Sequence, residues 1–290
     1  MTDFTQIKLD IADKIATITL NRPEKMNAYT RTMGQEIMAA MDQIDADDDV
    51  RAVIFTGSGD RAFCAGADLT PEGGGHVFSD PTEVEDLSDP KVRDGGGLLT
   101  LRLFESKKPL ISACNGVAVG VGATMQLAMD MRLASDTARY GFVFARRGIV
   151  PEAASSWFLP KIVGISQALE WCYSGRVFDA EEAKAGGLIR SIHGPADLMP
   201  AARGLAQEIA DNTSAVSVAM TRAMMYRLST ADHPMEAHKI DSRAIYRLSR
   251  GKDAKEGIAS FLEKRAPEYP AKVSEDMPDF YPWWDEAEYD

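Results

Sequence analysis

PLISACNGVAVGVGATMQLAMDM, residues 109–131, places a loop of small residues directly after an apolar, strand-like run. The shorter segment FCAGADL, residues 63–69, repeats this arrangement behind the apolar run Ala52–Phe55. Small residues let backbone N–H groups approach a ligand oxygen that larger side chains would block. The chain therefore contains two matched strand-to-loop units, and the rest of the fold is built outward from them.

The two loops, 64–67 and 115–122, predict an oxyanion hole. Its donors are expected to be the backbone N–H groups of Ala67 and Val121. The second loop leads into the apolar stretch 123–131, which is expected to be helical. The free N–H groups and positive dipole end of that helix would face the same oxygen. A thioester enolate, whose oxygen carries a negative charge, is the ligand expected for such a site.

Alternating and β-branched runs predict strands at 15–20 and 52–56. Between them, apolar residues recur at helical spacing from Met33 to Ile44. A strand, a helix and a second strand form a crossover unit, which recurs where 99–104 leads into 109–114. Repetition of this unit predicts an α/β fold of layered sheets with covering helices.

Strand signals nearly vanish beyond about residue 175. Asp179, with Glu182 three residues on, predicts the capped start of a short helix that ends at Gly186-Gly187. Longer helices are expected at 197–211, 214–228, 233–250 and 253–265.

Two segments depart from this pattern. Residues 70–95 are rich in proline, glycine and acids, which predicts a long loop, either an active-site lid or a disordered segment. The end of the chain, 269–290, is acidic but holds four large aromatic rings between Phe280 and Trp284. A purely acidic tail would stay solvated, so these rings predict docking on the tail's own subunit or on a neighbouring one.

Composition limits the classes of function. The chain has 290 residues, of which 45% are hydrophobic, enough for one full core with an appendage. No apolar run reaches 18 residues and the N-terminus lacks a signal pattern, so a cytoplasmic protein is expected. A net charge of −12 argues against nucleic acid and anionic membranes as partners, since both demand a basic face.

Cysteine and histidine usage predicts no metal site. Three cysteines without CxxC spacing indicate neither a disulfide framework nor zinc, and the four histidines lack the i, i+4 spacing of a helical metal site. Cys64 lies beside the first loop, but no histidine follows it closely. A small buried thiol is therefore preferred over a nucleophile.

With these features in view, the chain resembles the crotonase superfamily of enoyl-CoA hydratases and isomerases, and its motifs are most similar to those of the isomerases. The segments that carry the resemblance are IATITLNRPEKMNA at 15–28, SGRVFDAEEA at 174–183 and EGIASFLEKR at 256–265. The resemblance implies a repeated ββα spiral core at 1–195, with the long loop 70–95 inside it. It also implies a helical region at 196–268 that drives trimers or hexamers, followed by the tail at 269–290.

The resemblance further implies an acyl-CoA substrate, with coenzyme A as part of the thioester and no prosthetic group. Lys25, Ala65 and Asp68 fall on CoA-site positions, although an Asx-type loop anchor is the preferred role of Asp68. In this family the C-terminal helix supplies an aromatic residue and a lysine to a neighbouring subunit, and Phe261 and Lys264 match them. Arg22 and Arg265 are weaker candidates for the phosphates, because surface charges are usually only solvated.

Hydration of an enoyl-CoA needs two positioned acid–base groups, which are two glutamates in the family's hydratases. Thr124 and Phe144 stand at those positions here. A hydroxyl and a phenyl ring are not general bases near neutral pH, so weak or absent hydratase activity is expected.

Glu152 remains, in GIVPEAASSWF at 148–158, a segment that resembles the one carrying the catalytic base of the family's isomerases. One glutamate suffices to move a double bond from the β,γ to the α,β position. The aromatic residues Phe142, Phe144, Trp157 and Phe158 are expected to surround Glu152 and raise its pKa. The competing interpretation is a first-turn acid at a helix N-terminus, since Glu152 follows a proline.

Two other functions stay open at this point. The oxyanion hole could serve hydratase, hydrolase or lyase chemistry with a residue of the long loop, such as Glu72 or Asp80. Alternatively, the chain could be an acyl-CoA-binding protein that has kept the fold and lost turnover.

Overall fold

The computed structural model describes residues 4–70 and 84–289. Its strands are β1 (Ile7–Ala12), β2 (Ile15–Leu20), β3 (Ala52–Gly57), β4 (Ala62–Cys64), β5 (Leu110–Cys114), β6 (Val117–Val119), β7 (Met131–Ser135), β8 (Arg139–Gly141), β9 (Val177–Asp179) and β10 (Ser191–His193). Its α-helices are α1 (Arg31–Ala46), α2 (Gly95–Phe104), α3 (Val121–Thr124), α4 (Ser155–Val163), α5 (Ile165–Ser174), α6 (Ala180–Ala185), α7 (Leu198–Asn212), α8 (Ala215–Leu228), α9 (Pro234–Leu248) and α10 (Lys252–Glu263). Short 3₁₀ turns are η1 (Pro23–Lys25), η4 (Pro90–Val92), η5 (Met125–Ala128) and η6 (Ala145–Arg147).

The strands form two sheets, and from β3 to β8 consecutive strands alternate between them. One sheet has the order β1-β2-β3-β5-β7-β10, and the other has the order β4-β6-β8-β9. Each pair β3/β4, β5/β6 and β7/β8 thus contributes its first strand to the larger sheet and its second to the smaller one, and helical segments follow each pair. The chain winds as a repeated ββα coil, which confirms the predicted α/β spiral core.

Most of the strand and helix predictions are confirmed, including β2, β3, α1 and the four C-terminal helices. Two short strands that left no clear signal in the sequence, β9 and β10, follow residue 175. Both are only three residues long, too short to show the alternation by which a strand is recognised. Asp179 does cap α6, since its carboxylate accepts the N–H of Glu182 at 2.9 Å.

The helix expected over 123–131 is confirmed only as far as Ala128. One turn of α-helix, α3, passes into η5 and ends at Ala128. The N–H of Asp130 instead donates to Leu110 in β5 at 2.9 Å, and Arg132 takes up the carbonyl of Met129. These tertiary contacts start β7 where apolar periodicity alone continued the helix.

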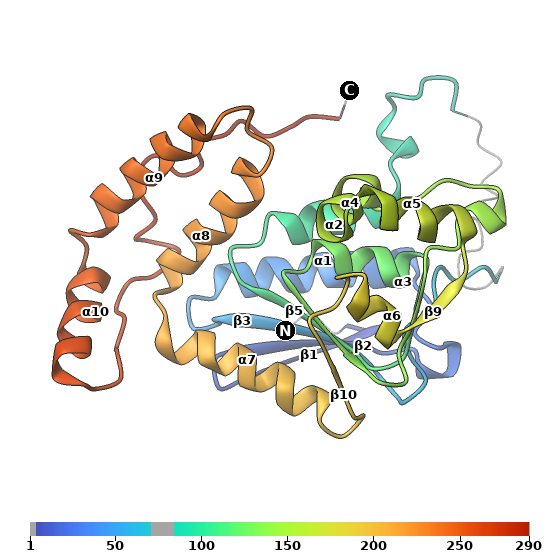
Figure 1. Ribbon diagram of the computed structural model, residues 1–290, viewed down its shortest axis with the longest axis horizontal. Helices are drawn as coiled ribbons and strands as arrows, with labels where there is room; N and C mark the ends of the chain where they lie inside the picture. The colour runs from blue at the N-terminus through green and yellow to red at the C-terminus, as the bar shows by residue number, and fades with distance from the viewer. Residues whose placement is uncertain (1–3, 71–83, 290) are drawn as a thin grey trace.

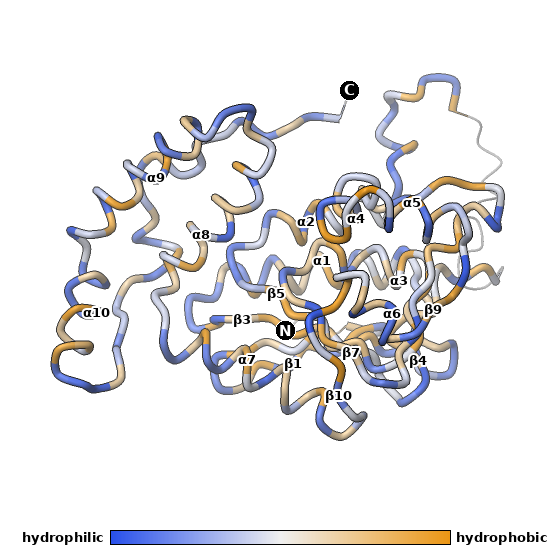
Figure 2. The backbone as a smooth tube through the Cα atoms, in the orientation of Figure 1, coloured by the Kyte–Doolittle hydropathy of each residue, from blue (hydrophilic) through white to orange (hydrophobic). Residues whose placement is uncertain are grey.

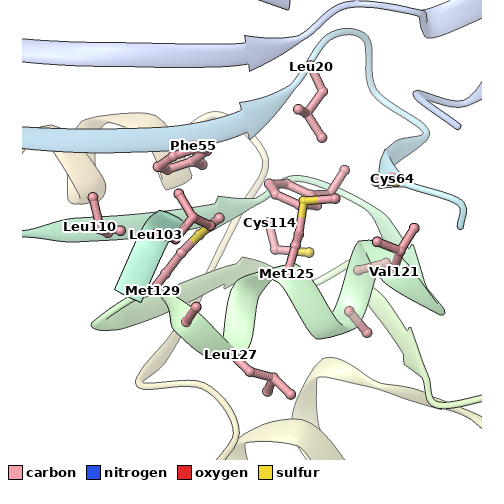
Figure 3. Close-up of a cluster of buried hydrophobic side chains, with 14 of the residues drawn as sticks. Leu20, Phe55, Cys64, Leu103, Leu110, Cys114, Val121, Met125, Leu127 and Met129 are labelled. Carbon is pink, nitrogen blue, oxygen red and sulfur yellow. The ribbon is translucent and has the colours of Figure 1, made fainter. Parts of the chain in front are cut away.

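The main core lies between the sheets and helices α1 and α2. Figure 3 shows part of it, where Met125 and Met129 from η5 and its C-terminal end lie close to Phe55, Leu103 and Cys114. These side chains are fully buried. A smaller cluster lies where α7 packs its face of Leu198, Ala202 and Ala206 against the larger sheet. The loops that follow β4 and β6 therefore rest on a rigid, filled interior.

Helix α8 is fastened to the core by Arg222. Its buried guanidinium pairs with Asp130 at 3.0 Å and donates to the carbonyls of Leu103, Phe104 and Ser106. Beyond it, α9 and α10 extend away from the sheets as an arm (Figure 1). Figure 2 shows hydrophobic stretches along this arm. The exposed large side chains of α9 and α10 include Ile245, Tyr246, Phe261 and Leu262.

The aromatic end of the chain docks on its own subunit. The guanidinium of Arg227, in α8, lies 4.0 Å from the ring centre of Trp284 and 4.8 Å from that of Phe104 in α2. Glu105 pairs with Arg227 and holds it there. Within 4–70 and 84–289, no helix is long and apolar enough to cross a membrane.

Candidate active site

The two small-residue loops leave the same edge of the smaller sheet. Strands β4 and β6 pair in parallel, with Cys64 opposite Ala118, so the loops that follow them lie side by side. A Cβ added to Gly122 would stand 2.0 Å from the carbonyl oxygen of Cys64. One added to Gly66 would stand 3.1 Å from the carbonyl oxygen of Val119, and the φ of Gly66 is +104°. Glycine at these positions is what allows the two backbones to meet.

Both predicted donors present free N–H groups. Tyr29 bridges to Ala67: its N–H donates to Gly66 and its carbonyl accepts from Asp68, each at 2.8 Å, so the N–H of Ala67 points away from this ladder. Val121 is the first residue of α3, where an N–H has no intrahelical partner. Among the described residues neither N–H has a hydrogen-bond acceptor. The fold brings together two unpaired donors on adjacent loops.

Glu152 lies in the turn before α4 rather than in its first turn. Ala153 and Ala154, which follow it, both have left-handed backbones with φ of 58° and 51°. The side chain of Glu152 makes no cap for α4; it accepts the hydroxyl of Thr124, in α3, at 2.5 Å. The interpretation of Glu152 as a first-turn acid of a helix is therefore wrong. The bend at Ala153 and Ala154 turns its carboxyl inward, toward Thr124, which lies one helical turn after Val121.

Burial, helped by the neighbouring Asp94 carboxylate and opposed by the Thr124 hydroxyl, raises the pKa of Glu152 to about 8. The raised pKa agrees with the prediction from sequence. The side chains that interact with its carboxyl, however, are those of Thr124 and Asp94 rather than the aromatic residues expected from the sequence. Phe142 stacks on Trp171, and Trp157 and Phe158 pack against Phe104.

Asp94 is the site residue that sequence reasoning missed. It is the N-cap of α2, where its carboxylate accepts the N–H groups of Gly96 at 2.8 Å and Gly97 at 2.9 Å. The same carboxylate accepts the N–H of Ala153 at 2.7 Å. An aspartate before a glycine run and an apolar segment is a recognisable cap signal. Nothing in the sequence showed that this cap also reaches the turn of Glu152.

Thr124 and Phe144 are both buried, at 0% and 5% exposure. The positions that carry glutamates in the family's hydratases thus hold a hydroxyl and a ring inside the protein. Cys64 is buried as well, and burial raises the pKa of its thiol to about 12. A thiol with that pKa is not a nucleophile at neutral pH.

Asp68 is engaged inside its loop. It accepts the backbone N–H and hydroxyl of Thr70 with one oxygen, at 3.0 and 2.7 Å, and pairs with Arg22 at 2.8 Å with the other. Burial opposes ionisation, but these bonds from Thr70 and Arg22 hold the pKa of Asp68 at about 2. The contacts support the anchoring role and leave neither Asp68 nor Arg22 directed toward a ligand.

The remaining CoA candidates divide between two places. Lys25 is exposed at the end of η1, and the next residue, Met26, accepts the N–H of Ala65 at 3.1 Å, so Lys25 lies beside the first loop, of which Ala65 is a part. Phe261, 81% exposed, and Lys264 lie at the end of α10 on the outer arm (Figure 1). A single chain does not bring this second pair to Glu152.

Glu72 and Asp80, the alternative acids of the long loop, lie outside the described residues. In the parts of the chain that the structure describes, no three or more histidine, cysteine, aspartate or glutamate side chains gather as a metal would require.

Known proteins share this architecture. A family model described as Enoyl-CoA hydratase/isomerase matches residues 10–272. An enoyl-CoA hydratase of Alternaria alternata is 41% identical over 259 residues, 89% of this chain and 83% of its own. A 1,2-epoxyphenylacetyl-CoA isomerase of Escherichia coli (strain K12) is 31% identical, over 89% of this chain and 95% of its own.

Solved structures agree with this assignment. The crystal structure of an enoyl-CoA hydratase from Bacillus anthracis superposes with a TM-score of 0.83 and 29% identity, over 91% of this chain and 99% of its own. Fold, motifs and relatives point the same way, and the chain belongs to the enoyl-CoA hydratase/isomerase family, with a crotonase fold.

Proposed function

We propose that the protein moves the double bond of a 3-enoyl-CoA to the 2 position, with Glu152 as its single acid–base residue. The observation that carries the proposal is the placement of one inward-turned carboxyl with a raised pKa beside two loops with free N–H groups. Thr124 connects these features, since it contacts Glu152 and lies one helical turn after Val121.

The reaction divides into two proton transfers at one carboxylate. Glu152 takes a proton from the α carbon, and the electrons of that C–H bond spread over the double bond and the thioester carbonyl as a dienolate. The N–H groups of Ala67 and Val121 donate to the dienolate oxygen. Glu152 then returns the proton at the γ carbon, which leaves the double bond between the α and β carbons. The reaction consumes no water and needs no second base.

A carboxyl with a pKa near 8 suits this exchange, because its protonated and ionised forms differ little in free energy near neutral pH. Hydration would need a second group to activate water. Thr124 and Phe144 lack a carboxylate, and three backbone N–H groups already occupy the oxygens of Asp94. Several relatives are named hydratases, so 2-enoyl-CoA belongs in the same assay.

The acyl group is proposed to enter as a coenzyme A thioester, with no prosthetic group involved. Lys25, beside the first loop, and Ala65, within it, are the proposed contacts of CoA within one chain. Phe261 and Lys264 are proposed to serve the site of a neighbouring subunit, because they lie on the outer arm of their own.

Glu152→Gln is the decisive variant. The amide keeps the shape of the side chain but takes no proton, so isomerisation of 3-enoyl-CoA should fall by roughly 10² to 10⁴-fold, the usual contribution of a general base. Glu181→Gln, an exposed glutamate on α6, is the matched control and should retain full activity.

Acyl-CoA binding, followed by calorimetry, should survive in Glu152→Gln because both loops are unchanged. Equal isomerisation by wild type and Glu152→Gln would move the base elsewhere. Binding of both enoyl-CoA isomers by wild type with turnover of neither would favour the binding-protein function, and faster hydration of 2-enoyl-CoA than isomerisation would favour the hydratases.

A further inference from the structure

The N-cap and the second turn of α2 hold the turn of Glu152 from two sides. Asp94 accepts the N–H of Ala153 at 2.7 Å, and the hydroxyl of Thr100, one turn later in α2, donates to the carbonyl of Ala153 at 2.9 Å. A residue with positive φ that is not glycine persists only where its surroundings hold it. Ala153, with φ of 58°, is held at both of its backbone polar groups.

The carboxyl groups of Glu152 and Asp94 meet over Gly96. A Cβ added there would stand 2.0 Å from Oε2 of Glu152 and 3.2 Å from Oδ1 of Asp94. The two carboxyls are close enough for the Asp94 carboxylate to raise the pKa of Glu152. Each known partner of Asp94 is an N–H donor, so its oxygens act as acceptors. Glu152 is the member of the pair that faces Thr124 and the interior.

We propose that Asp94 is a positioning residue for Glu152: it holds the backbone of the Glu152 turn and, as a fixed like charge against that carboxyl, sets which protonation state the resting protein carries. This inference rests on the proposed function for its catalytic meaning, but the pairing itself is a property of the folded chain. Asp94 is exposed and Glu152 is not, so the proton of the pair belongs on Glu152.

Other titratable groups face the pair. Tyr29, in the segment before α1, donates its hydroxyl to the carbonyl of Gly95 at 3.2 Å, and Cys64 lies at the end of β4. Both interact electrostatically with Glu152, and burial raises the pKa of each far above neutrality. They stay uncharged across the range in which Glu152 titrates. Asp94 is thus the charged neighbour that acts on Glu152 there.

The test replaces Asp94 with uncharged residues that can still accept hydrogen bonds. In Asp94→Asn a carbonyl oxygen can still accept the N–H of Ala153, and in Asp94→Ser a hydroxyl can still cap α2. Without the like charge, the pKa of Glu152 should fall by about one unit or more. The acid limb of kcat/KM for 3-enoyl-CoA should move to lower pH, with a roughly tenfold gain at pH 6 for each unit.

Thr100→Val is the matched control, because it removes the other brace on Ala153 and leaves every charge in place. Its kcat should fall while its acid limb stays where it is in wild type. A second readout needs no turnover: carbon-13 NMR of glutamate-labelled protein, with the Glu152 signal assigned by Glu152→Gln, reports the titration of that carboxyl directly.

An unchanged Glu152 titration in both folded Asp94 variants would overturn the inference, and so would a Thr100→Val shift as large as theirs. A titration that shifts in a protein that isomerises nothing would leave the inference standing and defeat the proposed function instead. The two failures are therefore distinguishable.

Discussion

Gly96 is the residue on which the two carboxyls of the site converge, and it has an immediate neighbour for comparison. A Cβ at Gly96 would stand 2.0 Å from Oε2 of Glu152, whereas one at Gly95 would have no atom within 4 Å. Both glycines lie in the first turn of α2 with ordinary φ values. Alanine at either position reduces backbone flexibility, but only alanine at Gly96 also takes up the space of the Glu152 carboxyl.

Gly96→Ala should therefore displace Glu152 and reduce isomerisation by at least roughly 10²-fold, since a misplaced base loses most of its effect. Gly95→Ala should retain activity and gain a few tenths of a kcal/mol of stability from the better helix former. Steady-state rates and thermal unfolding of the two variants test this. Equal rates in both would mean that Glu152 works from another position.

The pKa of Glu152 also predicts how stability depends on pH. Its pKa rises from 4.5 in the unfolded chain to about 8 in the folded protein, because burial disfavours the charge. The folded state therefore holds the proton more tightly. Stability is greatest below about pH 4.5 for this group and declines as pH rises to about 8, by an amount on the order of a few kcal/mol.

Glu152→Gln removes this dependence, because an amide does not titrate. Relative to wild type, its thermal midpoint should rise steadily between pH 5 and pH 8, as followed by circular dichroism. A constant difference between the two proteins over that range would show that Glu152 has an ordinary pKa in the folded chain.

At this scale the sequence supplied the local candidates and missed the distant one. Glu152, Ala67 and Val121 were recognisable because each belongs to a short segment whose residue order is itself the signal. Asp94 reaches Ala153 across 59 positions. Such a contact depends on how α2 and the turn before α4 pack, which a single sequence does not display.

Among the elements, α3 has the most direct connection to the proposed chemistry. Val121 is its first residue, and Gly120 precedes it with a φ of 55°. Proline is well tolerated at the first position of a helix, where its missing N–H breaks no helical bond. The Val121→Pro variant thus removes a proposed oxyanion donor at little cost to α3 itself.

Val121→Pro should lower isomerisation by about 10² to 10³-fold, the effect of losing one such donor. Val121→Ala keeps the N–H and should remain within a few-fold of wild type. Single-turnover rates with 3-enoyl-CoA compare the two. Near-normal turnover by folded Val121→Pro would exclude Val121 as a donor.

Elements with many residues of one pattern were predictable, and those decided by few residues were not. The four helices from α7 to α10 agree with the sequence prediction to within a few residues, because each is at least 12 residues long. The strands β9 and β10 are three residues long, too short for an alternating pattern to be recognised. The end of η5 depends on a distant contact, the hydrogen bond from the N–H of Asp130 to Leu110 in β5.

For the whole molecule, the apolar surface of the outer arm predicts assembly. Ile245 and Tyr246 on α9 and Phe261 and Leu262 on α10 are 63 to 81% exposed in the single chain. Several large apolar side chains on one arm mark an interaction surface. We expect a trimer or hexamer in which this arm contacts another subunit.

Light scattering at micromolar concentration should give a mass of three or six chains. Leu262→Asp should shift the mass toward the monomer, because a carboxylate is costly to bury. Tyr173→Asp, equally exposed on α5, lies on the α/β part of the molecule away from the arm and should leave the mass unchanged (Figure 1). A monomeric wild type would also remove the cross-subunit role of Phe261 and Lys264.

The winding of the core determines the order in which its strands and site loops can assemble during synthesis on the ribosome. Each of β3, β5 and β7 pairs with the strand wound just before it, so the sheet can grow in register as the chain emerges. The loop of Ala67 arrives first, that of Val121 next, and the turn of Glu152 only after β8. A nascent chain would thus complete the two loops proposed to bind the thioester oxygen before the turn that carries the proposed base.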